Sequence, residues 1–223
     1  MEHEIGNIKE WRGVKNLVAA RVVTDDDGEG GYTTGTVYSI GGVSSITRTT
    51  ENSNEEHFYD DLPAVLISGV GADTVTIDTS ALSLEVLAWL TGQTYNALLG
   101  AMIEGKPRPP YFALGYIIEK DDGSKTYVWH YKGKFSLPDQ TNTTKDNTTN
   151  ANGNQLVYTG IATTNKMDNG KGAKALVVDD GLHLTNVYHF FDTVTLPDEL
   201  EHSTAIVGLA IAGVALVGNE QEP

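Results

Sequence analysis

A regular alternation of apolar and polar residues runs through residues 127–137, which read YVWHYKGKFSL. The odd-numbered positions carry aromatic and apolar residues, namely Tyr127, Trp129, Tyr131, Phe135 and Leu137. The even-numbered positions carry the potentially cationic residues His130, Lys132 and Lys134. Because successive side chains point to opposite faces of a strand, the pattern predicts a strand about 36 Å long, roughly twice the usual length.

Other runs of β-forming residues predict a chain composed mainly of strands. The expected strands are residues 16–24, 32–40, 43–50, 64–67, 74–77, 111–120, 155–164 and 175–178, and we expect residues 186–196 to close the domain with a strand. The dipeptide Gly41-Gly42 supplies the positive φ of a tight turn and predicts a hairpin between residues 32–40 and 43–50. Neither face of residues 43–50 is strongly apolar, which favours a sheet edge or contact with a partner chain.

One segment changes to a three-residue apolar period and predicts a helix. Residues 83–91 read SLEVLAWLT, in which Ser83 can cap the start and Gly92 can end the helix. The apolar positions are Leu84, Leu87 and Leu90. Trp89 lies on the flank, where we expect it at the margin of the core or, alternatively, in contact with another subunit.

Polar segments separate these elements and set the expected organisation. Residues 25–31, 52–61 and 139–154 predict loops, and the last is a low-complexity Asn/Thr stretch. We therefore predict a mainly β fold: a β-sandwich or barrel-like domain with one short flanking helix and long extended hairpins. The expected division is an N-terminal arm (1–12), a β domain (13–196) and a C-terminal extension (197–223).

The composition narrows the classes of function. The formal net charge is −15, which disfavours non-specific attraction to DNA or to an anionic membrane. No cysteine is present, which excludes a disulfide framework and a cysteine-based metal site and suits a reducing compartment. No Lys or Arg follows Lys174, so the C-terminal part is acidic. This acidity serves solubility or, alternatively, forms a surface past which DNA moves without binding.

Three groups of residues carry chemistry used in metal binding or catalysis, but their spacing argues against both. The run Asp25–Asp27 resembles a calcium loop, yet the twelfth position is Thr36 where a Glu is required. A histidine pair six residues apart lacks a further ligand motif: His183 and His189. A group of possible acids and bases has no nucleophile motif beside it: Glu55, Glu56, His57, Asp60 and Asp61. We expect no enzymatic activity, no cofactor and no metal.

The longest uncharged apolar run is residues 205–218, AIVGLAIAGVALVG. As a helix its 14 residues would span about 21 Å, short of the roughly 30 Å that a bilayer requires. We therefore expect no membrane anchor, but a strand or short helix that packs on the domain or on a neighbouring molecule.

Three segments resemble the major tail (tail-tube) proteins of long-tailed bacteriophages. They are GVKNLVAARVVTDDD near the start, LSLEVLAWLTG in the predicted helix, and PPYFALGYIIEKDDGSKTYVWHYKGKFSLP around the long strand. The similarity extends in order from about residue 13 to about residue 164. The pairing of PPYFALGY with YVWHYKGKFSLP is its most specific part.

This resemblance implies a structural, self-assembling protein. In that family, copies close into six-membered rings, long strands join edge to edge, and the stacked rings form a tube through which the genome passes. It implies a homo-oligomer in the virion tail, assembled in the bacterial host cytoplasm together with tape-measure and tail-terminator proteins. DNA would pass without sequence-specific binding through a bore whose acidic surface repels phosphate.

Under this hypothesis, functional residues are those at subunit interfaces. We expect inter-sheet packing at such interfaces from Tyr127, Trp129, Tyr131 and Phe135, pairing across chains from Lys132 and Lys134, and a helix contact from Trp89. The alternative is a monomeric β-sandwich module that binds carbohydrate or mediates surface adhesion through exposed aromatic side chains. An enzyme is the third and least supported class.

Overall fold

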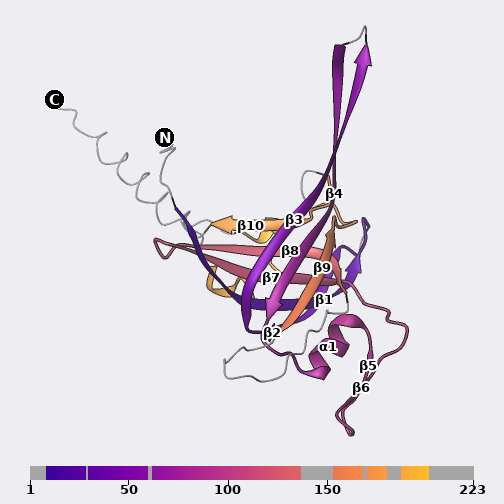
Figure 1. Cartoon of the computed structure of the whole chain (residues 1–223), viewed down its shortest axis with the longest axis vertical. Coiled ribbons are helices and arrows are strands. Elements are labelled where there is room, and N and C mark those ends of the chain that lie inside the picture. The colour runs from indigo at the N-terminus through magenta and orange to yellow at the C-terminus, as the bar shows by residue number, and fades with distance from the viewer. Residues whose placement is uncertain are drawn as a thin grey trace, which may run out of the picture.

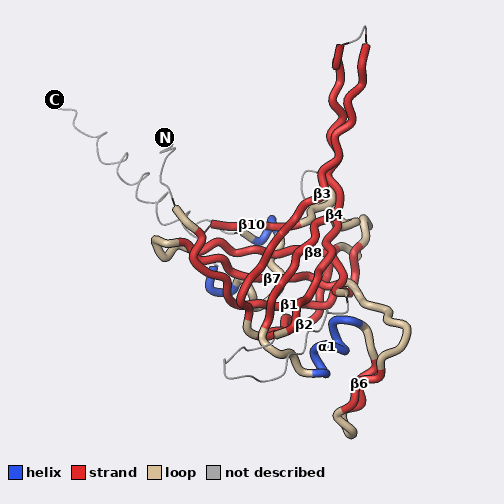
Figure 2. Tube along the Cα trace, in the orientation of Figure 1, coloured by secondary structure: helices blue, strands red, loops and turns tan. Residues whose placement is uncertain are grey.

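The computed structural model describes residues 9–28, 30–59, 62–136, 153–167, 170–179 and 187–200. Figures 1 and 2 show a curled antiparallel sheet with one short helix beside it. The strands are β1 (Trp11–Asp25), β2 (Tyr32–Gly41), β3 (Val43–Tyr59), β4 (Leu62–Thr79), β5 (Thr94–Asn96), β6 (Ala101–Ile103), β7 (Phe112–Lys120), β8 (Lys125–Phe135), β9 (Asn154–Ile161) and β10 (Ala175–Asp179). The helices are α1 (Leu84–Thr91) and the 3₁₀ turns η2 (Val187–His189) and η3 (Pro197–Glu199).

The main sheet closes on itself almost completely. Its strand order is β2-β1-β7-β8-β9-β4-β3, and β10 pairs with the first half of β8 beside β9. β2 and β3 lie at opposite ends of this order, yet only Gly42 separates them in sequence. The sheet must therefore curl until its two ends meet, and Figure 1 shows β3, β4 and β9 crossing in front of β7 and β8. The predicted fold class, mainly β and sandwich-like with one short helix, is confirmed.

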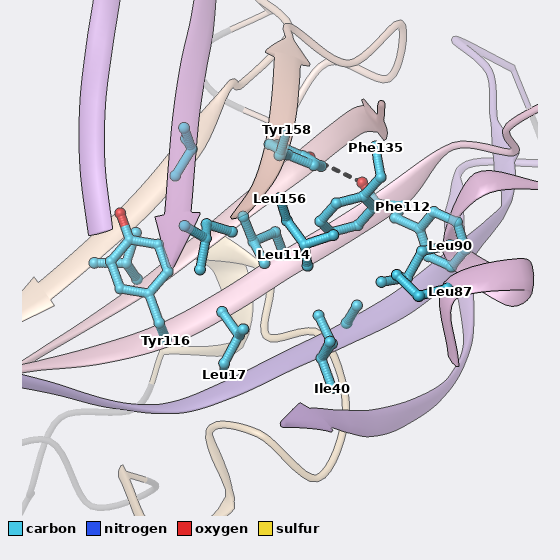
Figure 3. Packing of buried hydrophobic residues seen from close by; sticks show 14 residues of the cluster. Leu17, Ile40, Leu87, Leu90, Phe112, Leu114, Tyr116, Phe135, Leu156 and Tyr158 are labelled. Atoms are coloured by element: carbon cyan, nitrogen blue, oxygen red, sulfur yellow. Dashed lines mark hydrogen bonds between the residues drawn. The ribbon is translucent and has the colours of Figure 1, made fainter. Parts of the chain in front are cut away.

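Two apolar cores form on the two faces of the curled sheet. The inner cluster fills its concave side and includes Leu17, Phe112 and Tyr158, which are at most 1% exposed. Figure 3 shows these side chains converging from several strands and from α1, with the Tyr158 hydroxyl donating to the Phe112 carbonyl at 2.9 Å. The outer cluster lies on the other face and is covered by residues 187–200, through Phe190 and Val194. Each large side chain buried in this way stabilises the fold by about 1.5–3 kcal/mol.

The predicted helix is confirmed, including both of its ends. The Ser83 hydroxyl accepts from the Val86 amide at 3.3 Å, and Gly92 adopts the left-handed conformation with φ 71°. A Cβ at Gly92 would also lie 2.3 Å from the Arg108 carbonyl oxygen. Both the left-handed conformation and the lack of space therefore require glycine at this position. Leu87 and Leu90 enter the inner cluster, whereas Leu84 at the first turn is 44% exposed.

The predicted hairpin at Gly41-Gly42 is wrong. β2 pairs with β1 and β3 pairs with β4, and neither glycine adopts a positive φ. Gly42 instead carries the chain from one end of the sheet to the other: its amide donates to the Ser80 hydroxyl at 3.2 Å and its carbonyl accepts from the Ser80 amide at 2.9 Å. The glycine pair marks a crossing between sheet ends, not a tight turn.

The predicted loop at residues 52–61 is also wrong over residues 52–59, the part that the structure describes, as is the break between the expected strands 64–67 and 74–77. β3 continues to Tyr59 and β4 runs without interruption from Leu62 to Thr79. Two glycines between these ranges allow close strand contact: a Cβ at Gly69 would lie 2.7 Å from the Ser53 hydroxyl, and one at Gly71 3.0 Å from the Glu51 Cβ. Glycine in a strand often marks such close approach.

The other expected boundaries are met closely, with one exception. β7, β9 and β10 follow the predicted segments within a few residues, and β1 begins at Trp11, earlier than expected. In the predicted closing segment, the described residues 187–196 form η2 and turns where a strand was expected, although Phe190 and Val194 do pack on the domain. Residues 139–152 of the predicted Asn/Thr loop and the apolar run 205–218 lie outside the described residues.

Candidate assembly surface

The aromatic face of β8 lies inside the protein's own fold. Tyr127, Trp129 and Tyr131 are 7%, 0% and 0% exposed and belong to the outer cluster, and Phe135 is 1% exposed. The indole Nε1 of Trp129 donates to the Phe190 carbonyl at 3.0 Å. Residues 187–200 of the same chain therefore cover the aromatic face of β8. Side chains this deeply buried have no surface for another subunit, and the interface role expected for these four is corrected to a core role.

The alternation along β8 also changes face part of the way along the strand. Leu114 pairs with His130 and Phe112 with Gly133, so Tyr131 and Lys132 together oppose Ala113 in a β-bulge. Because of this extra residue, the odd-numbered side chains after the bulge point to the opposite face of the sheet from those before it. Phe135 therefore points into the inner cluster, opposite to Tyr131.

Lys132, expected to pair across chains, is paired within its own chain. Its ammonium lies 2.5 Å from Asp25 Oδ2, which also accepts from the backbone amide of Thr164 at 2.9 Å. Burial raises the pKa of Asp25, but hydrogen bonds from Lys132 and the Asn165 amide outweigh this and hold the pKa below its ordinary value. Asp25, the first residue of the predicted loop 25–31, is thus a structural ion-pair partner at the end of β1. The Lys134 ammonium lies 4.5 Å from the ring centroid of Tyr111.

Trp89 borders a surface groove over α1. Its ring packs edge-on between Tyr38 and Phe112, with centroid distances of 5.5 and 4.7 Å, at the margin of the inner cluster. The groove has a volume of about 540 Å³ and is also lined by Tyr95 and Gln93. The Gln93 Nε2 is buried, and among the described residues it has no hydrogen-bond partner.

A buried ionic cluster, which the sequence analysis missed, links β3, β4 and the segment before β10. Asp73 is fully buried, with its carboxylate oxygens 2.6 Å from Arg48 Nη2 and 2.9 Å from Lys174 Nζ. Burial raises its pKa, but hydrogen bonds from Lys174 and Arg48 hold the pKa below its ordinary value. A signal was present, because Asp73 shares its parity in β4 with the buried residues Val75 and Ile77.

His130 lies next to this cluster and is 1% exposed. Its Nε2 is 3.3 Å from the Tyr116 hydroxyl, and its Nδ1 has no hydrogen-bond partner among the described residues. Burial, reinforced by the nearby charge of Arg48, lowers the pKa of the imidazole to about 4. His130 is therefore neutral in the folded protein at physiological pH and is a core residue, although the alternation suggested a polar face.

The buried imidazole predicts a pH-dependent stability. Folding depresses the His130 pKa from about 6.5 to about 4. The stability that depends on the neutral imidazole is therefore fully present above the unfolded-state pKa and is lost as the pH falls toward the folded-state pKa. Between pH 7 and pH 5 the free energy of unfolding should fall by about 2 kcal/mol on this account. Urea titrations of the wild type and His130→Leu measure it, and the variant should show the smaller decrease. Equal slopes would contradict this assignment, since the other histidines are common to both proteins.

The candidate metal-ligating and acid–base residues within the described ranges lie on separate elements. His189 is exposed and its Nδ1 lies 2.7 Å from Asp192 Oδ2, whereas His183 lies outside the described residues. Glu55, Glu56 and His57 fall on β3, and Asp60 and Asp61 are outside the described residues. Within the ranges that the structure describes, no group of three or more His, Cys, Asp or Glu residues is arranged to hold a metal ion.

The most prominent surface feature is a two-stranded arm, formed by residues 51–59 of β3 and 62–72 of β4. Figure 1 shows it projecting from the body of the protein. The two strands of the arm pair with each other along its length, and β4 pairs with β9 only from Asp73 onward. In the described part of the chain, β3 has no second strand beside it. A bulge between Thr50 and Asn52 marks the point where the arm leaves the body. At about 3.3 Å per residue the arm is roughly 30 Å long.

Comparison with models of known protein families finds no match, and comparison with curated proteins finds no similar sequence. In the part of the chain covered by the structure, no helix has the length and apolar character needed to span a bilayer.

Proposed function

We propose that this protein is a tail-tube subunit of a long-tailed bacteriophage or of a phage-derived particle, which assembles into stacked hexameric rings around a conduit for the genome. The observation that carries the proposal is the arm of residues 51–72. An arm of two strands, whose outer edges pair with no strand among the described residues, suits edge-to-edge pairing with further copies. The sequence resemblance to tail-tube proteins is the independent reason for choosing this particular assembly.

Two properties of the arm favour contact with another subunit. Isolated two-stranded ribbons are marginally stable in water, and free strand edges readily pair with other chains. In addition, the β4 side of the arm has an apolar sequence, LPAVLISGVGA, and Val70 in it is 65% exposed. Ring closure would supply partners for the free edges without leaving an end open to unlimited aggregation.

Shortening the arm should abolish assembly while leaving the body folded. Asn52 and Val70 are paired in the ladder, so replacing residues 53–69 by Asn-Gly recloses the hairpin with a two-residue turn. Electron microscopy of the concentrated wild type should show annular or tubular particles, and the shortened protein should show none. Near-ultraviolet circular dichroism checks that the body is intact. A wild type that stays monomeric, or a shortened variant that still forms rings, would reject the proposal.

A matched pair of point substitutions makes this test more specific. Val70 in the arm and Val23 in β1 are both 65% exposed. Val70→Lys places a charge on the arm and should raise the concentration needed for assembly by about tenfold or more, which corresponds to about 1.4 kcal/mol. Val23→Lys makes the same chemical change away from the arm and should have little effect.

One observation favours the alternative of a carbohydrate-binding module. The groove over α1 brings together Tyr38, Trp89 and Tyr95, and Gln93 Nε2, which has no partner among the described residues, offers a donor to a hydroxyl group. Such a module would remain monomeric, and its melting temperature would rise with a glycan in the wild type but not in Tyr38→Ala. A carbohydrate-binding function gives the arm no role, and we therefore rank this alternative second.

A further inference from the structure

The curled sheet is left open along one seam, where β1 departs from β2. β2 pairs with β1 only from Leu17 onward, and a bulge between Lys15 and Val18 accompanies the positive φ of 58° at Asn16. The first part of β1, from Trp11 to Asn16, therefore has β7 on one side. On its other side no strand pairs with it within the described ranges.

β3 forms the opposite wall of this seam. It is the last strand in the sheet order and pairs only with β4, so its outer edge is also free of a described partner. Between the two edges is a cavity of about 560 Å³ lined mainly by apolar side chains: Val14, Ile46, Tyr116, Ile118, Val128 and Val177. At its rim, Trp11 and Val177 are 62% and 54% exposed.

An added strand fits this seam better than a small molecule does. The free edge of β1 presents a row of backbone amides and carbonyls, which need hydrogen-bond partners at regular spacing. An extended peptide supplies them and also inserts alternate side chains into the cavity. The preferred occupant is therefore a polypeptide segment that is apolar, uncharged and at least as long as the six-residue edge.

The protein's own sequence contains such a segment. Residues 205–218 are uncharged and apolar over 14 residues, and they follow Leu200, where the description ends. Their flanks are acidic, with Glu201 before and Glu220 and Glu222 after. Leu200 packs against the outer cluster, which contains Val178. Val177, next to Val178 in β10, lines the cavity. The four residues 201–204, which link Leu200 to the apolar run, can span about 13 Å.

The charge of the seam complements these acidic flanks. Arg12 and Arg48 both line it. Arg48 shares the single carboxylate of Asp73 with Lys174, so this cluster keeps a net positive charge. These positive charges would attract the acidic flanks of an inserted strand.

We propose that residues 205–218 of the same molecule insert into this seam, pair with the free edge of β1 over Trp11–Asn16 and place apolar side chains in the cavity. This assigns a role to the apolar run that neither the tail-tube resemblance nor the arm accounts for. It is independent of the proposed function, because the seam and the arm use different parts of β3.

Disulfide trapping in the full-length protein tests the inference, since the chain has no cysteine of its own. Gly13→Cys places a thiol on the free edge of β1, where a Cβ meets nothing within 4 Å. It is combined in turn with Ala210→Cys, Ala212→Cys and Ala215→Cys and oxidised at high dilution. A disulfide forms only at Cβ separations near 3.8 Å, so at least one of these pairs should cross-link within one molecule.

The matched control moves the first cysteine to β2, with Thr36→Cys at an exposed position far from this edge. It should cross-link at background level with all three partners. Equal trapping from both positions, no trapping from position 13, or trapping only between two molecules would overturn the inference. Loss of tube assembly in the arm variants would leave it standing, so the two proposals fail separately.

A second measurement in the full chain does not depend on a disulfide. Ile211→Asp with Val214→Asp introduces charges that the apolar cavity should reject. If the inference is correct, amide hydrogen exchange of Trp11–Asn16 should accelerate by about tenfold or more in this variant. The fully exposed loop position of Leu98 provides the control, because Leu98→Asp should leave that exchange unchanged. Unchanged protection in both variants would count against insertion.

Discussion

Replacing Asp73 by alanine should lower the free energy of unfolding by about 3 kcal/mol, measured by urea titration at pH 7. Removing one partner of a buried ion pair costs about 3–5 kcal/mol, because the remaining charge is left without compensation. Two cations lose their shared partner here, Arg48 and Lys174. The expected value lies at the lower end because their side chains are 36% and 21% exposed and can partly turn to water.

Asp78 provides a control on the same strand. Its carboxylate accepts from the Ser45 hydroxyl at 2.5 Å and from Gln155 at 2.9 Å, but it has no cationic partner in the described part of the chain. Asp78→Ala should therefore cost only about 1 kcal/mol, as expected for ordinary hydrogen bonds. If both substitutions cost the same, the ionic cluster would not be a specific source of stability.

The double variant separates the ion pair from packing. Arg48→Met in the Asp73→Ala background removes one of the two stranded charges, and it should restore part of the lost stability. If Arg48→Met is equally costly with and without Asp73, the two residues are not energetically coupled.

Local signals in the sequence were sufficient for the short elements. Ser83 and Gly92 bracket an eight-residue helix because capping is decided by residues three or four positions apart. β7 and β8 are joined at Asp121–Gly123, where Asp-Asp-Gly is a typical turn sequence and Gly123 has a φ of 84°. In each case the physical cause lies within one turn of the chain.

Long-range pairing was not accessible in the same way. The polar run after Thr50 reads as a loop, because nothing local indicates that it pairs with residues 62–72. Gly41-Gly42 reads as a turn, because the curling of the sheet that brings β2 and β3 together depends on all the strands between them. Strand partners are set by the whole sheet, and a single alternation pattern does not identify them.

For a related reason, the sequence pattern of β8 does not distinguish a core strand from an interface strand. Alternation shows that one face of the strand is covered, but it does not show what covers it. The covering layer is residues 187–200, more than fifty positions further along the chain, and the bulge at Tyr131 and Lys132 then turns Phe135 to the other face. The partner of Lys132 is not evident from the sequence, because Asp25 is over a hundred residues away along the chain.

Trp129→Ala should destabilise the protein by about 3–5 kcal/mol, the range found when a large buried aromatic side chain is truncated. The indole is fully buried, packs against Gly115 and Phe191, and donates to the Phe190 carbonyl. Its removal leaves a cavity where residues 187–200 dock and takes one of two donors from the Phe190 carbonyl, which also accepts from the Thr195 hydroxyl at 2.9 Å. Amide exchange in that segment should therefore accelerate more than exchange in β1.

Tyr188 is the matched control, since it lies in the same covering segment and is 94% exposed. Tyr188→Ala should change the free energy of unfolding by less than about 0.5 kcal/mol. Trp129→Phe should lie between the two, because it keeps most of the apolar volume and loses the hydrogen bond. The opposite pattern, in which Trp129→Ala unfolds at the wild-type urea concentration but no longer assembles, would return Trp129 to the subunit interface that the alternation alone suggests.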